Sequence, residues 1–242
     1  MTPRTSRRRV RGIYRKELRE YRHNGNIVYA MVIFPLVFLI QPLIQIFALP
    51  SSASATLHHE HSLVYMLAIP ALVPATLAAY SVVGERLQGT LEPVLATPIR
   101  REELLLGKAL AAFVPSLAVS YSVFALFIGV VELFAQPGVA TALIQGPDLL
   151  AQLLFTPLLV AVSIWIGIAV SARSSDPRTA AQLALLVSLP SVAVTTLIAF
   201  NVIPAPLPVT IAFGAGLLIL VRLGWRVASA IFDRERLITS TK

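Results

Sequence analysis

The chain has 242 residues, of which 56% are hydrophobic and 13% are charged, whereas soluble domains are about 45–50% apolar and about 25% charged. This composition excludes an ordinary soluble globule and predicts an all-α, polytopic membrane protein. The absence of cysteine excludes disulfides, thiolate metal sites and a cysteine nucleophile. The net charge of +8 indicates either a nucleic-acid partner or basic cytoplasmic loops, and the positions of the charges distinguish these two interpretations.

Residues 1–26 form the first unit and carry nine of the Lys and Arg residues. Their apolar residues are spaced by three or four positions: Val10, Ile13, Tyr14, Leu18 and Tyr21. This spacing places them on one face of a helix. A basic helix with a narrow apolar face is typical of a helix that lies in the membrane interface. The alternative is a basic tail that only sets the topology.

Six apolar stretches follow, and they predict six spans within a transmembrane domain of residues 27–229. The spans cover residues 27–49, 63–83, 104–134, 149–172, 179–200 and 209–227. At 1.5 Å per residue the first reaches about 34 Å, which is enough to cross a hydrocarbon core of about 30 Å. The third is longer than a bilayer requires, so either one end projects into the cytoplasm or the helix breaks near Pro115. Residues 230–242 form a polar tail.

The Lys and Arg residues separate completely when the connecting segments are assigned alternately to the two sides of the membrane. Residues 1–26, 84–108, 173–178 and 222–242 carry nine, four, two and five of them, which is all 20. Residues 50–62, 135–147 and 201–208 carry none. The positive-inside rule therefore predicts that both termini and residues 84–108 are cytoplasmic. Orientation and contact with membrane lipid explain the basic charge, so we expect no nucleic-acid partner.

Two groups of polar residues have more than one interpretation. Gln41 and Gln45 lie four residues apart in the first span, where they either bond to neighbouring helices or line a substrate route. His58, His59 and His61 have side chains suited to a divalent metal. These histidines lie close together in a short loop, and no second group of ligand residues is visible in the sequence. We therefore expect a solvated loop without a bound metal.

The motifs of an energy source or a hydrolase are missing from the sequence. A phosphate-binding loop reads G-x-x-x-x-G-K-[ST], and neither Gly84–Gly89 followed by Thr90 nor Gly107-Lys108 followed by Ala109 fits it. We therefore expect no ATP hydrolysis by this chain. All twelve acidic residues fall in loops or at predicted helix ends, which disfavours an ion-driven carrier. No Ser/His/Asp set indicates a hydrolase.

A polar segment, residues 84–108, lies between the second and third spans, and we call it the island. Its residues follow a specific order. It contains Gly84-Glu85-Arg86, Gly89-Thr90-Leu91-Glu92, Leu95, Thr97-Pro98, Arg101, Glu103-Leu104 and Gly107-Lys108. This run resembles the membrane subunits of ABC type-2 exporters, in which it also lies between the second and third of six spans. Arg15-Lys16-Glu17-Leu18 and Phe232-Asp233-Arg234-Glu235 resemble the elbow helix and the ending of that family. The eight-residue turn 201–208 is a departure, because many members have a longer hairpin there. Whether this chain has a re-entrant gate between the fifth and sixth spans therefore stays open.

The resemblance implies a dimer, either a homodimer or a pair with a second permease, that carries two ATP-binding cassette subunits on the cytoplasmic side. It also implies that ATP and Mg bind to those partner subunits, that this chain binds no cofactor, and that it resides in a bacterial or archaeal cell membrane. Residues 84–103 would form a short coupling helix and its flanks. The residues expected to couple are Glu85, Arg86, Gly89, Thr90, Leu91, Glu92, Leu95, Thr97, Pro98, Arg101 and Glu103.

The expected activity is ATP-driven export of a hydrophobic or amphiphilic cargo, such as a drug or a lipid-like molecule. Polar residues in or beside the spans are candidates for the translocation path: Gln41, Gln45, Ser116, Ser120 and Asn201. The alternatives are a non-transporting scaffold or a passive channel that recruits a cytoplasmic partner through residues 84–103.

Overall fold

A computed structural model describes residues 6–23, 25–48, 61–89, 99–204 and 206–231. These residues are helical throughout apart from short turns, and no strand occurs among them. The elements are α1 (Arg7–His23), α2 (Gly25–Ala48), the 3-10 helix η2 (Ser62–Leu67), α4 (Ala68–Leu87), α6 (Arg101–Phe134), α7 (Pro137–Leu143), α8 (Gly146–Arg173), α9 (Pro177–Ala199) and α10 (Leu207–Ile231). The all-α prediction is confirmed.

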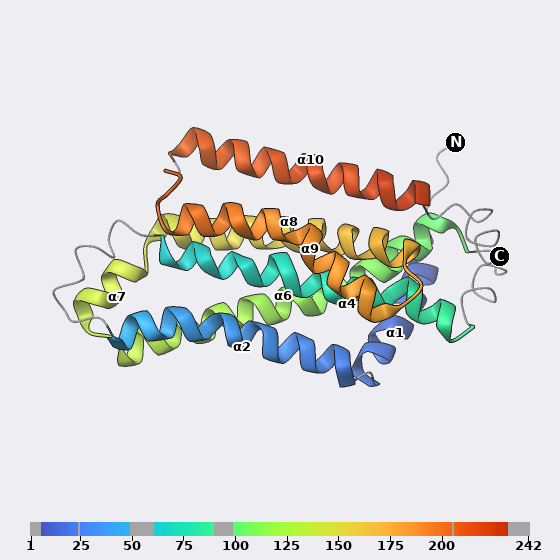
Figure 1. Cartoon of the computed structure of the whole chain (residues 1–242), viewed down its shortest axis with the longest axis horizontal. Helices are drawn as coiled ribbons and strands as arrows, with labels where there is room; N and C mark the ends of the chain where they lie inside the picture. The colour runs from blue at the N-terminus through green and yellow to red at the C-terminus, as the bar shows by residue number, and fades with distance from the viewer. Residues whose placement is uncertain (1–5, 24, 49–60, 90–98, 205, 232–242) are drawn as a thin grey trace.

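Six of these segments are long and apolar enough to cross a membrane, which confirms the predicted number of spans. They run back and forth in a bundle, with α1 at one end and α7 at the other (Figure 1). We call these the α1 end and the α7 end. Every Lys and Arg in the described ranges lies toward the α1 end, whereas the α7 end carries Glu132, Asp148 and His61. The cytoplasmic location of the α1 end stays a prediction from the positive-inside rule.

The centre of the bundle is α4, whose residues from Ala68 to Val83 are almost all buried. It packs chiefly against α8 and α9. Pro74 has no N–H group to donate to the carbonyl of Pro70, four residues earlier. The hydroxyl of Ser163 on α8 lies 3.3 Å from that carbonyl oxygen and donates to the Ala71 oxygen at 2.6 Å. A neighbouring helix therefore supplies the donor that proline removes.

Small residues on α8 allow α4 to approach closely. Ser163, Gly167 and Ser171 are spaced by four and lie on one face. A Cβ atom added to Gly167 would lie 2.5 Å from the carbonyl oxygen of Ala75. The Ser171 hydroxyl accepts hydrogen bonds from the backbone N–H groups of Val82 and Val83, at 3.1 and 3.0 Å. Small residues at the contact are the usual way in which membrane helices pack at short range.

The structure resolves the question of the long third span. α6 continues through Pro115 without a break and comprises 34 residues, so it measures about 51 Å. The helix therefore extends beyond a hydrocarbon core of about 30 Å. α7 is an element that the sequence analysis did not predict, and it begins with Pro137 at a position where proline is well accommodated.

Candidate functional site

α1 docks against the bundle through a face that includes a buried carboxylate. Ile13, Glu17 and Tyr21 are spaced by four and are all buried, while Val10, Tyr14 and Leu18 are only half-buried. The sequence predicted the apolar stripe but not the burial of Glu17 within it. α1 packs mainly on α6.

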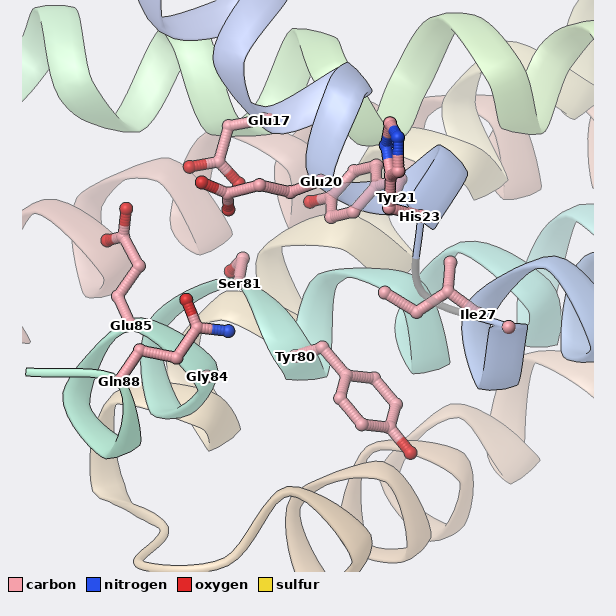
Figure 2. Close-up of a pocket in the computed structure, with 11 residues that line it drawn as sticks. Glu17, Glu20, Tyr21, His23, Ile27, Tyr80, Ser81, Gly84, Glu85 and Gln88 are labelled. Atoms are coloured by element: carbon pink, nitrogen blue, oxygen red, sulfur yellow. The ribbon is translucent and has the colours of Figure 1, made fainter. Parts of the chain in front are cut away.

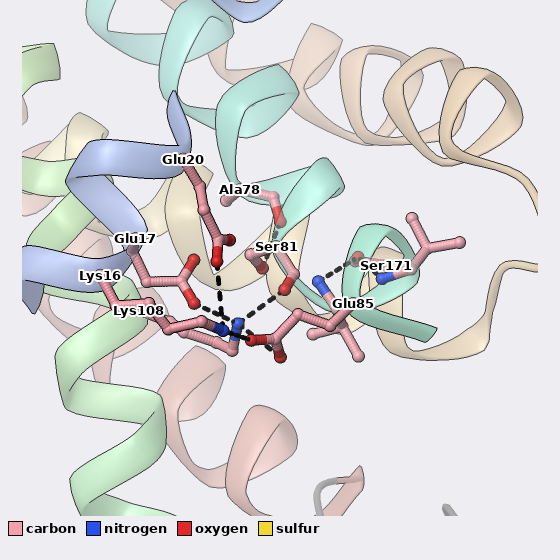
Figure 3. Close-up of polar contacts among 10 residues, drawn as sticks. Lys16, Glu17, Glu20, Ala78, Ser81, Glu85, Lys108 and Ser171 are labelled. Atoms are coloured by element: carbon pink, nitrogen blue, oxygen red, sulfur yellow. Dashed lines mark hydrogen bonds and ion pairs between the residues drawn. The ribbon is translucent and has the colours of Figure 1, made fainter. Parts of the chain in front are cut away.

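The carboxylate of Glu17 belongs to a cluster of five charges at the junction of α1, α4 and α6 (Figure 3). Lys108 on α6 is completely buried, and its Nζ atom lies 2.6 Å from Glu17 Oε1 and 2.8 Å from Glu85 Oε2. Lys16 on α1 lies 2.5 Å from Glu85 Oε1 and 3.3 Å from Glu20 Oε1. The charges thus alternate in sign: Glu20, Lys16, Glu85, Lys108 and Glu17. We call this set the charge cluster.

Lys108 also donates a hydrogen bond to the backbone oxygen of Ser81, at 2.7 Å. Its ammonium group therefore has three short contacts, which a buried charge requires. Burial raises the pKa of the Glu17 carboxyl, although Lys108 opposes this effect. Burial lowers the pKa of Lys16, but the hydrogen bond to Glu85 and the negative charges of Glu85, Glu17 and Glu20 together outweigh this effect, so the net pKa is raised. The cluster contains three carboxyls and two ammonium groups.

A second set of contacts connects the start of α1 to the start of α6. The carboxylate of Glu103 accepts hydrogen bonds from the backbone N–H groups of Ser6 and Arg100, at 2.7 and 3.1 Å. Arg9 Nη1 lies 3.4 Å from the same carboxylate. These hydrogen bonds stabilise the ionised form of the Glu103 carboxylate at the N-terminus of α6.

The start of the island, where α4 ends, is connected to the end of α8 and to the link between α8 and α9. The guanidinium of Arg86, near the end of α4, donates hydrogen bonds to the backbone oxygens of Ala172 and Ser174, at 3.0 and 3.2 Å. Both flanks of the island are therefore connected to the bundle by charged side chains.

A pocket of about 490 Å³ lies beside the charge cluster, between α1 and α4 (Figure 2). Oxygen atoms of Glu17, Glu20 and Glu85 lie within 4.8 Å of one another there, which is a spacing that a metal ion tolerates. However, Lys16 and Lys108 already contact these carboxylates. Two ammonium groups neutralise most of the negative charge, so this group of carboxylates does not favour a divalent cation.

The structure places five of the predicted coupling residues. Glu85 and Glu103 are buried and face α1, Arg86 contacts the α8–α9 link, and Arg101 is exposed in the first turn of α6. Gly89 follows α4 with φ +67°, a conformation that favours glycine. The remaining predicted residues lie outside the described residues: Thr90, Leu91, Glu92, Leu95, Thr97 and Pro98. The coupling role of all eleven stays a prediction.

The candidate path residues lie on different elements. Ser116 and Ser120 are buried in α6, and the Ser116 hydroxyl has no hydrogen-bond partner among the described residues. Asn201 is exposed in the turn after α9, with φ 54°. The side chains of Gln41 and Gln45 lie outside the described part of the chain. A role for these residues in a translocation path therefore also stays a prediction.

One of the three histidines considered as metal ligands is described by the structure. His61 Nδ1 lies 2.8 Å from Asp148 Oδ1, a contact that the sequence analysis did not predict. His58 and His59 lie outside the described residues.

Gly107 permits the close packing of α1 on α6, and we expect Gly107→Ala to weaken it. The added Cβ atom would lie 2.5 Å from Ile13 Cγ2 and 2.6 Å from Ile13 Cβ. A new rotamer of Ile13 does not move its Cβ atom, so α1 must shift. Overpacking of this kind costs about 1–3 kcal/mol. Thermal unfolding of the purified protein measures the loss, and Gly129→Ala in the same helix is the control, because its Cβ atom would meet nothing within 4 Å. A Gly107→Ala variant as stable as Gly129→Ala would contradict this packing.

Comparison with known families now identifies the class. The model of the family described as ABC-2 family transporter protein matches residues 11–214, which begin within α1 and include the charge cluster. The chain belongs to this family. It is the multi-pass membrane permease of an ABC transporter, and it associates with an ATP-binding cassette subunit. No curated protein matches the chain.

Proposed function

We propose that this permease is the membrane subunit of an exporter and that its ATP-binding subunits dock at the α1 end. ATP and Mg would bind to those subunits, and this chain would bind no cofactor. The observation that carries the proposal is the charge cluster, in which fully buried Lys108 connects Glu17 of α1 with Glu85 of α4. Such a connection suits a device that conveys the movement of a docked ATPase to membrane helices.

The two helices that border the island are both held by α1. α4 enters the island and α6 leaves it, and both are attached to α1 by charged contacts. Because packed helices move as units and not as continuously deformable bodies, force on the island would displace α1, α4 and α6 together. In this proposal Glu85 and Glu103 brace the island from inside. Arg101 and the residues between Gly89 and Pro98 would contact the ATP-binding subunit.

The proposal includes a second permease and an apolar cargo. The outward faces of α2 and α10 present large apolar side chains, including Val37, Ile44, Ile211 and Leu218. Such faces are suited to lipid or to a second permease, and a transport path would form where two permeases meet. A path bounded by apolar helices with scattered hydroxyl groups would accept a hydrophobic or amphiphilic molecule, which is why we propose cargo of that class.

The test uses the permease co-purified with its ATP-binding subunit and reconstituted into liposomes. We expect Glu92→Lys to reduce cargo-stimulated ATP hydrolysis by at least about fivefold, because charge reversal at a polar contact costs on the order of 1–3 kcal/mol. Glu132→Lys makes the same change at the exposed α7 end and should leave hydrolysis unchanged. Equal stimulation by both variants would contradict docking at the island. ATP-independent flux of cargo would instead indicate a passive channel.

A further inference from the structure

A cavity at the α7 end is distinct from the pocket beside the charge cluster. It measures about 380 Å³ and lies between η2, α8, α9 and α10. Most of its wall is apolar and includes Leu154, Phe155, Ile198 and Phe213. The rings of Phe155 and Phe213 meet edge to face, with centroids 5.2 Å apart. A cavity of this size and apolarity is suited to a small organic ligand.

One carboxylate oxygen in this wall has no partner among the described residues. Asp148 is 2% exposed, and its Oδ1 atom is bonded to His61 Nδ1, while Oδ2 is buried without a hydrogen bond. The two threonines of the cavity wall are already engaged. Thr195 donates to the backbone oxygens of Ser191 and Val192, and Thr210 donates to that of Pro206. Asp148 Oδ2 is therefore the buried side-chain oxygen of the described wall that has no hydrogen-bond donor.

Burial disfavours a charged carboxylate at Asp148, whereas its contact with His61 and its place in the helix favour one. Asp148 lies in the first turn of α8, where the helix dipole stabilises an anion. An ionised carboxylate accepts several hydrogen bonds, and a buried oxygen without one is costly. His61 supplies a single donor, to the other oxygen. A ligand with a charged N–H group would satisfy Oδ2 and compensate its charge.

We propose that this cavity binds a hydrophobic protonated amine. The ammonium group donates to Asp148 Oδ2, and the apolar body packs against Leu154, Phe155 and Phe213. An anion is disfavoured because every described Lys and Arg lies toward the other end of the bundle. A neutral apolar molecule leaves Oδ2 without a partner. A metal ion finds only His61 and Asp148 as side-chain ligands of the usual kinds among the described wall residues.

The test measures binding of two probes to the purified full-length permease in lipid nanodiscs at pH 7. The probes are 1-naphthylmethylamine, which is protonated, and 1-naphthalenemethanol, which has the same ring system and no charge. We expect the amine to bind about tenfold more tightly than the alcohol, as a charge-assisted hydrogen bond predicts. Asp148→Asn should abolish this preference. Glu132→Gln removes the same charge from an exposed site at the same end and should retain it.

A cavity-filling variant keeps the proposal testable if Asp148→Asn fails to fold. Ala151 is part of the cavity wall, and Ala151→Phe should weaken the binding of both probes while leaving Asp148 in place. Equal affinity of the wild-type protein for amine and alcohol overturns the proposal. Unchanged binding in Ala151→Phe also overturns it, because the probes would then occupy another place. The assay contains no ATP-binding subunit, so its outcome is independent of the exporter proposal.

Discussion

Replacing Lys108 with methionine will destabilise the protein by about 3–5 kcal/mol, because it leaves the carboxylates of Glu17 and Glu85 buried without their shared cation. Lys108 is completely buried, and its Nζ atom lies within 2.8 Å of both carboxylates. The Ser81 carbonyl loses its hydrogen bond from the ammonium as well. Thermal unfolding of the purified permease in detergent measures the loss, and we expect a reduced yield of folded protein.

Lys16→Met is the matched control, because Lys16 also contacts Glu85. Its side chain is 40% exposed, so solvent screens the charge and the expected loss is at most about 1 kcal/mol. The triple variant Glu17→Gln/Glu85→Gln/Lys108→Met removes the buried charges together and should recover part of the stability. If the Lys108 and Lys16 variants were equally stable, Lys108 would not be the centre of the charge cluster.

Gly167→Ala is the second substitution with a large expected effect. The new methyl group would lie 2.5 Å from the carbonyl oxygen of Ala75 and 2.7 Å from the Ala78 Cβ atom. α4 and α8 must separate to accept it, and their backbone atoms cannot rotate away as a side chain does. We expect a loss of about 1–3 kcal/mol, measured as a lower midpoint of thermal unfolding.

The control is Gly129→Ala in α6. A Cβ atom at Gly129 meets no other atom within 4 Å, and alanine favours a helix over glycine by about 0.5–1 kcal/mol. This variant should be neutral or slightly more stable. A Gly167→Ala variant as stable as Gly129→Ala would show that the two helices are not packed so closely.

The spans could be predicted from the sequence because burial in lipid imposes a strong and local demand on composition. Residues 63–83 and 179–200 were found as apolar stretches, and the structure has helices there. The island was likewise visible, since its charges interrupt two such stretches. Proline positions were less informative. Pro115 was considered as a break, but α6 continues through it.

The charge cluster could not be predicted from the sequence, because its members come from three separate segments. Glu17 lies in the predicted interfacial helix, and Glu85 and Lys108 lie near predicted span ends. These are ordinary places for a solvated charge. Only the tertiary packing of α1 shows that they are buried together. One signal was available: Glu17 lies four residues after Ile13 and four before Tyr21, so it falls within the stripe that was expected to be apolar. His61 and Asp148 are also far apart in the chain, so their contact could not be predicted from the sequence either.

The contacts of α4 have a consequence for the biosynthesis of this protein. α4 leaves the ribosome before α8, yet Ser163 and Ser171 of α8 satisfy backbone groups of α4 around Pro70 and Val82. Until α8 emerges, the carbonyl of Pro70 has no donor from its own helix, and an unsatisfied backbone group in lipid costs several kcal/mol. α4 therefore cannot complete its hydrogen bonding until the nascent chain includes α8. The central helix of the finished bundle reaches its final environment only after that later span is made.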